Sequence, residues 1–132
     1  MAFDLHRPGF QFAAKAQGAV NPVASGKLAG QPVGFGTAAE QAVFLASGAE
    51  PWGVAKVGSY ADGDRMTIYE PGNYVKADAA VSVGWAAEVS IATANGALGL
   101  VASGSWSLGK SIGPAAAGDV FTVLIRPQRI IV

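Results

Sequence analysis

The chain has 132 residues, enough for one domain with a single hydrophobic core. Nine basic side chains balance nine acidic ones and only 14% of residues are charged, so the charge does not favour binding to nucleic acid or an anionic membrane. The absence of cysteine excludes disulfides and thiolate metal sites. Because a surface so poor in charge would be sticky if left bare, we expect much of it to be covered within an assembly.

The N-terminal stretch, residues 1–22, shows neither a helical nor a strand period. It carries three phenylalanines, Phe3, Phe10 and Phe12, which would be wasteful in a free tail. We therefore expect residues 1–22 to form an extended arm that docks these rings on another surface, ahead of a β domain formed by residues 23–132.

From residue 30 onward, short apolar runs alternate with Gly, Pro, Asn and Asp. This spacing predicts an all-β fold, a small single-domain β-sandwich or barrel of jelly-roll-like type. Residues 120–125 are apolar almost throughout and are expected to form a strand that is central in its sheet or buried on both sides. Residues 65–70 alternate between polar and apolar, as in a strand with one face exposed to solvent. Residues 89–109 are uncharged but rich in Gly and Ser, so we expect no membrane helix. The expected strands are 33–36, 42–46, 52–57, 65–70, 74–76, 87–93, 99–103, 106–110, 120–125 and 129–132.

One unit of the sequence occurs twice. WGVAKVGSYADGDRMTIYEP, from Trp52, resembles WSLGKSIGPAAAGDVFTVLIRP, from Trp106. In each copy a Trp-led strand ends at a lysine, a loop of small residues follows, and Gly-Asp precedes a second strand that runs to a proline. The pattern predicts a strand–loop–strand unit in which Gly supplies a positive φ and Asp caps the turn with its side chain.

A phosphate-loop pattern, G-x-x-x-x-G-K-[ST], is filled by Gly104, Gly109, Lys110 and Ser111. A functional loop of this kind must open a helix, and the Ile-Gly-Pro that follows cannot propagate one. Moreover, Lys56 occupies the place of Lys110 in the other copy of the repeat, where no such loop exists. We therefore expect a strand here, and no nucleotide or other cofactor.

The sequence offers only weak candidates for other catalytic or metal-binding residues. His6 is the only histidine, and its place in the expected arm suits an interface better than a catalytic base. Asp62 and Asp64 lie too close together for a calcium-binding loop, and capping of the turn explains them. We expect no catalytic residues, no metal site and no enzymatic activity.

Aromatic and basic residues offer contact surfaces instead. Trp52 and Trp106 hold equivalent positions in the repeat, which favours packing over the stacking of bases or sugars. Arg126 and Arg129 flank a proline near the end, where they either pair with the acids of a partner or lie in a solvated turn.

The motifs W-G-V-A-K, G-D and E-P-G-N-Y-V-K-A in the first half resemble those of the small capsid decoration (cement) proteins of tailed bacteriophages. So do A-x-V-S-I-A-T-A-N-G-A-L-G and G-D-V-F-T-V-L-I-R-P in the second half. The resemblance covers residues 30–132. It implies a β-sandwich or barrel without catalytic residues that is made in the cytoplasm of the bacterial host and resides on the outer surface of the capsid.

The resemblance further implies a partner, the major capsid protein, and self-association as a homotrimer, with a dimer as the alternative. The function would be to staple neighbouring capsid subunits after the shell expands. One rival is a carbohydrate-binding β-sandwich displayed on the virion, with Trp and Tyr as its platform; the other is an enzyme, for which the chain offers no convincing residue set. The expected contact residues are Phe3, His6, Phe10, Phe12, Trp85, Arg126 and Arg129.

Overall fold

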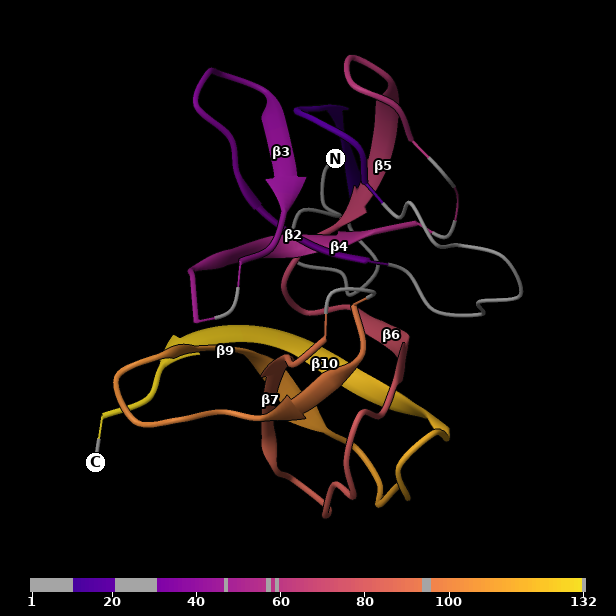
Figure 1. Ribbon diagram of the computed structural model, residues 1–132, viewed down its shortest axis with the longest axis vertical. Helices are drawn as coiled ribbons and strands as arrows, with labels where there is room; N and C mark the ends of the chain where they lie inside the picture. The colour runs from indigo at the N-terminus through magenta and orange to yellow at the C-terminus, as the bar shows by residue number, and fades with distance from the viewer. Residues whose placement is uncertain are drawn as a thin grey trace, which may run out of the picture.

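The structure, a computed structural model, describes residues 11–20, 31–46, 48–56, 58, 60–93 and 96–131. Every regular element among these residues is a strand, which confirms the all-β prediction. The strands form a five-stranded closed barrel and a five-stranded sheet, which lie one above the other in Figure 1. No helix in this described part of the chain could span a bilayer. The strands are β1 (Gln11–Ala16), β2 (Gln31–Phe35), β3 (Gln41–Phe44), β4 (Pro51–Ala55), β5 (Arg65–Tyr69), β6 (Tyr74–Asp78), β7 (Glu88–Ile91), β8 (Leu98–Leu100), β9 (Trp106–Ser111) and β10 (Val120–Arg129).

The barrel has the strand order β1-β3-β2-β4-β5 and is closed by β1. This strand pairs antiparallel with β5, with Gln11 opposite Tyr69, and parallel with β3, with Lys15 opposite Gln41. A barrel of only five strands has a narrow interior, and small side chains allow it to close. The buried residues inside it are accordingly rich in alanine: Ala14, Ala16, Val20, Val33, Ala42, Ala55, Met66 and Ile68.

The expected arm falls partly on this barrel. Of residues 1–22, the described ones are 11–20, and residues 11–16 form β1. Val20 is fully buried, and its backbone exchanges hydrogen bonds with that of Tyr60. Residues 11–20 are therefore part of the barrel rather than of an extended arm, whereas residues 1–10 lie outside the described part of the chain.

The second sheet is antiparallel, with the order β6-β10-β9-β7-β8. As the apolar pattern predicts, β10 is an interior strand, between β6 and β9, but its residues are fully buried on one face only. An isolated bridge between Ala79 and Leu98 joins the two edges of the sheet at one point, so the sheet curls around its own core. The core contains Ala77, Ala79, Val83, Val89, Leu98, Leu108, Phe121, Val123 and Ile125.

Strand β4 links the two cores. Val54 packs with the core of the second sheet, whereas the next residue, Ala55, packs inside the barrel. This follows from the alternation of side chains along a strand, which sends neighbours to opposite faces. Tyr69 of β5, which is opposite Val54, also packs against the core of the second sheet. The barrel and the sheet therefore share an apolar contact through β4 and β5.

The repeated unit folds as expected in both copies. Gly63 and Gly118 have φ values of 88° and 91°. Each lies in a turn in which the N–H of the following Asp donates a hydrogen bond to the backbone carbonyl three residues earlier. In each turn the Asp carboxylate also accepts a hydrogen bond from the backbone N–H three residues earlier, at 2.8 Å for Asp64 and 3.3 Å for Asp119. The first unit, β4 and β5, belongs to the barrel and the second, β9 and β10, to the sheet.

Nine of the expected strands each correspond to an observed strand, and the tenth, residues 129–132, is wrong. No separate strand begins at residue 129. Instead, β10 continues through Pro127 to Arg129, with a bulge between Ile125 and Gln128 in its pairing with β9. The bulge accommodates the proline, which cannot donate a ladder hydrogen bond. Arg126 and Arg129 thus lie on a strand and not in a solvated turn.

Candidate contact surfaces

The expected contact residues that the structure describes do not form one site. Phe12 lies on β1 of the barrel, whereas Trp85 lies in the turn before β7. The segment between β6 and β7 lies at the end of the sheet that points away from the barrel (Figure 1). Arg126 and Arg129 are exposed on β10, and Arg129 Nε donates a hydrogen bond to the Gly104 carbonyl at 3.3 Å. Phe3, His6 and Phe10 lie outside the described residues.

Trp85 is the most exposed aromatic side chain among the described residues, at 74%. It belongs to a turn in which Ala86 has a φ of 62°, a conformation that costs an L-residue about 1–2 kcal/mol. The turn is fixed by a hydrogen bond from the Ala86 N–H to the Ser111 carbonyl at 2.8 Å. A large ring held in solvent by a strained, anchored turn is available for contact with another molecule.

Three aromatic rings of the barrel lie against one another. The ring centroid of Trp52 is 4.5 Å from that of Phe12 and 5.0 Å from that of Phe35, with the planes of Trp52 and Phe35 inclined by only 17°. These residues come from β4, β1 and β2, and only the barrel brings them together. Trp52 and Phe12 also pack against the barrel core, whereas Phe35 is 54% exposed. We call this group the aromatic stack.

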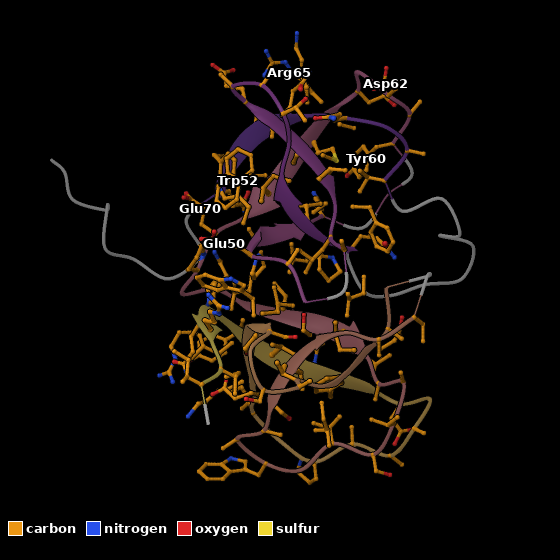
Figure 2. All side chains as sticks on the ribbon, turned by 60° about the vertical axis from the view of Figure 1, so that its left-hand side comes forward. Glu50, Trp52, Tyr60, Asp62, Arg65 and Glu70 are labelled. Carbon is orange, nitrogen blue, oxygen red and sulfur yellow. The ribbon has the colours of Figure 1, made fainter. Side chains whose placement is uncertain are left out.

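Glu70 follows β5 and lies on the same flank of the molecule as Trp52 and Glu50, as Figure 2 shows. Its Oε2 atom is buried and has no hydrogen-bond partner among the described residues. Burial raises the pKa of the Glu70 carboxyl, because loss of water disfavours the charged form. A carboxylate in this state is stabilised by any positive charge that reaches it.

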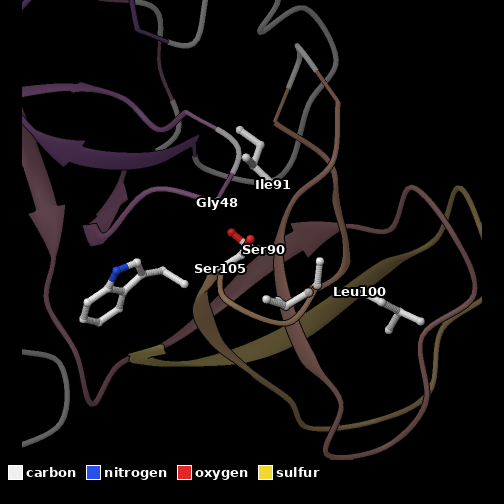
Figure 3. A pocket seen from close by; sticks show the side chains of 8 residues that line it. Gly48, Ser90, Ile91, Leu100 and Ser105 are labelled. Carbon is white, nitrogen blue, oxygen red and sulfur yellow. The ribbon is translucent and has the colours of Figure 1, made fainter. Parts of the chain in front are cut away.

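A small cavity of about 110 Å³ lies beside β7 and β8 (Figure 3). Its lining combines Ile91 and Leu100 with the serines Ser90 and Ser105. Ser90 is 5% exposed, and its hydroxyl makes no hydrogen bond with any described residue. The volume is well below the roughly 300–1,000 Å³ of typical ligand pockets, so the cavity has room for a small group only.

The residues of the phosphate-loop pattern have structural roles. Residues 106–111 form β9, which confirms the strand expected there. Gly109 leaves room for β10, since a Cβ atom there would lie 1.9 Å from the Leu124 carbonyl oxygen. Lys110 Nζ lies 3.7 Å from the carboxylate of Glu88, whose other oxygen accepts a 2.7 Å hydrogen bond from the buried Ser107.

The two acids near residue 63 also have structural partners. Asp62 Oδ1 accepts a hydrogen bond from the Gly18 N–H at 2.8 Å, which ties the turn before β5 to the segment after β1. Asp64 caps the turn itself. The described part of the chain contains no group of three or more His, Cys, Asp or Glu residues that could hold a metal ion.

No protein-family model and no curated protein matches the chain. Its fold is similar to that in the crystal structure of the head fiber gp8.5 N base in bacteriophage phi29, with a TM-score of 0.62. The similarity covers 89% of this chain and 93% of the phage protein, at 16% sequence identity. At this identity the comparison shows a shared fold, which includes both the barrel and the sheet because nearly the whole of each chain is matched.

Proposed function

We propose that this protein is a structural component of a phage virion that binds the outer surface of the capsid and cements neighbouring major capsid protein subunits. The observation that carries the proposal is the fold similarity to a phage head fiber base over nearly the full length of both chains. The resemblance of its turn and strand motifs to capsid decoration proteins supports the same class of function.

The composition of the surface fits this role. The described residues expose several large apolar side chains, of which Trp85, Leu100 and Tyr74 are 74%, 65% and 60% exposed. Protein interfaces are enriched in aromatic residues and depleted of charge at their centres. We propose that the surface contacts capsid and sister subunits in a homotrimer, or alternatively a dimer. The contact residues would be Phe3, His6, Phe10, Phe12, Trp85, Arg126 and Arg129.

The proposed function is mechanical and requires no chemical step. A protein that binds the expanded shell more tightly than the unexpanded or ruptured one stabilises the expanded shell by mass action. Many copies on one shell, or several contacts within an oligomer, multiply a modest affinity for each site.

The test is co-sedimentation of the purified protein with expanded and unexpanded shells of the phage that encodes it. A variant without residues 1–10 tests the arm, because this truncation ends before β1, whereas removal of residues 1–20 would open the barrel. We expect saturable binding that prefers expanded shells and weakens on truncation. Full binding after truncation would move the contacts to the β domain, and no binding to either shell would refute the cement role.

Trp85→Ala tests the β domain as a contact surface. Its side chain is mostly in solvent, so the substitution should leave the free energy of unfolding within about 0.5 kcal/mol of the wild type. If Trp85 contacts the shell, the variant should bind at least roughly tenfold more weakly, as is typical when a central aromatic residue is removed. Val81→Ala, at another exposed apolar residue of the same loop, is the matched control.

A further inference from the structure

The aromatic stack of Phe12, Phe35 and Trp52 is open on one side. Phe35, its outer member, is 54% exposed and lies nearly parallel to the indole of Trp52. The faces of aromatic rings carry negative partial charge, which attracts cations, and indole does so most strongly. The stack therefore offers a flat, electron-rich surface on the flank of the barrel.

Two carboxylates lie beside this surface. Glu50 precedes Pro51, which is opposite Gly34 in the β2–β4 pair. The backbone of Glu50 approaches Gly34, the residue before Phe35, closely: a Cβ atom on Gly34 would lie 3.3 Å from the Glu50 carbonyl oxygen. Glu70 follows Tyr69, whose partner in β4 is only two residues from Trp52. Figure 2 shows Glu50, Trp52 and Glu70 on the same flank.

Neither carboxylate is neutralised within the part of the chain that the structure describes. Glu50 and Glu70 form no ion pair with a described residue, and Glu70 Oε2 is buried without a hydrogen-bond partner. On the barrel strands the basic residues are Lys15 and Arg65, which are opposite each other at the far end of the β1–β5 pair. Arg126 of β10 lies nearer to Glu70, because Ile125 exchanges backbone hydrogen bonds with Gly72 and Asn73, but it forms no ion pair with either carboxylate. This flank therefore carries two carboxylates that form no ion pair with any basic side chain of the described residues.

We propose that the aromatic stack, with Glu50 and Glu70 at its edge, binds a basic side chain of a partner protein, with arginine preferred over lysine. A guanidinium group lies flat on an aromatic face and at the same time donates paired hydrogen bonds to a carboxylate in its plane. The ammonium group of lysine is a point charge and uses only part of this geometry. A sugar would use the rings equally well but gains less from unpaired carboxylates than a cation does.

This inference concerns the chemistry of the surface and does not depend on the capsid proposal. The probe is the blocked peptide Ac-Gly-Arg-Gly-NH₂, titrated against the full chain while the indole N–H signal of Trp52 is followed by NMR. A single side-chain contact is expected to bind with a dissociation constant of roughly 1 mM or weaker. The matched probe carries citrulline, which has nearly the same shape without the charge. We expect it to bind at least about tenfold more weakly, as for the loss of a charge-assisted contact.

Variants test whether the arginine peptide binds at the proposed surface. Phe35→Ala and the double variant Glu50→Gln, Glu70→Gln should each weaken the arginine peptide several-fold. The controls are Tyr74→Ala, an equally exposed aromatic residue on β6, and Glu40→Gln, an exposed acid in the turn before β3; neither should change the affinity. Raised salt should weaken binding, because part of it is electrostatic.

Three results would overturn the inference. Equal binding of the citrulline peptide would show that charge is not recognised. A shift of the Trp52 indole by maltotriose, without one by the arginine peptide, would identify a sugar platform instead. Absence of any shift with these probes would show that the surface binds none of them.

Discussion

Among the described glycines, Gly109 leaves the least room for a side chain. A Cβ atom at this position would lie 1.9 Å from the carbonyl oxygen of Leu124 and 2.9 Å from the backbone nitrogen of Arg126. Both atoms belong to the backbone of β10, next to its bulge, so no side-chain rotation can relieve the contact. Gly109→Ala therefore requires β9 and β10 to separate by more than 1 Å to approach the ordinary contact distance of 3.4 Å.

The energetic cost follows from what this separation disrupts. Ile125, directly opposite Gly109, is fully buried in the core of the second sheet, as is Val123. Loss of one or two ladder hydrogen bonds costs roughly 1 kcal/mol each, and strain in a packed core adds about 1–3 kcal/mol. We therefore expect Gly109→Ala to lower the free energy of unfolding by about 2–5 kcal/mol, a large part of the typical 5–15 kcal/mol.

The assay is urea unfolding, followed by circular dichroism and tryptophan fluorescence. The control is Gly113→Ala, four residues away, where a Cβ meets nothing within 4 Å and φ is not positive. This control should be neutral or stabilise by up to about 0.5 kcal/mol, since it only reduces the freedom of the unfolded chain. If Gly109→Ala remained within about 1 kcal/mol of the wild type with an unchanged slope, the close approach of β9 and β10 would be refuted.

Three further predictions concern stability. Gly63→Ala, at a φ of 88°, should destabilise the protein by about 1 kcal/mol, whereas Ala86→Gly, at a φ of 62°, should stabilise it by about 0.5 kcal/mol. Both effects are measured as shifts in the urea midpoint. Stabilisation by Gly63→Ala or destabilisation by Ala86→Gly would contradict the turn geometry. Ser107→Ala should lower the free energy of unfolding by about 1–2 kcal/mol, because the buried hydroxyl donates a hydrogen bond to Glu88. Ser90→Ala should be neutral or stabilising, because the Ser90 hydroxyl has no partner among the described residues. Equal losses of stability in the two variants would argue against this difference. Because the pKa of Glu70 is raised in the folded protein, ionisation of its carboxyl opposes folding. Glu70→Gln should therefore not stabilise the protein below the pKa of an unfolded Glu, near 4.3, and should stabilise it as the pH rises through the higher folded pKa. A gain in stability that is largest at low pH would contradict this sign.

The sequence predicts most of the strands because each is bounded by residues that enforce a turn. Gly63 and Gly118 are both followed by Asp, and both turns have the expected geometry. The sequence does not predict β1, because QFAAKA contains no β-branched residue, although the Pro8-Gly9 pair shortly before it is a turn signal. Its strand conformation depends on backbone pairing with β3 and β5, which lie far along the chain.

The division into a barrel and a sheet depends on tertiary packing that the sequence does not reveal. Val54 and Ala55 are both apolar, and nothing in their types tells that they pack in different cores. The two copies of the repeat also differ in register. Ala55 is opposite Ile68 in the first, but its counterpart Gly109 is opposite Ile125 rather than Val123 in the second. An even shift keeps the same side chains facing inward, so the hydrophobic pattern alone cannot distinguish the two registers.

The candidate contact surface could be predicted only in part. Phe12 and Trp52 are conspicuous in the sequence, but their contact with Phe35 requires three separate strands to meet in the barrel. Glu70 lies beside a predicted turn and gives no sequence signal that one of its oxygens is buried. The role of Trp85 in contact with other molecules stays a prediction, which the shell-binding experiment tests.

The position of β1 between β3 and β5 has a consequence for how the chain folds. During synthesis β1 is made before β2, β3 and β4, and its antiparallel partner, β5, follows only after all three. Hairpin partners such as β2 and β3 can pair as soon as both are made, whereas β1 must wait, because closing a longer loop costs more chain entropy. Closure of the barrel is therefore expected to be a late step, and until it occurs the free edges of β3 and β5 can accept the β1 strand of another copy.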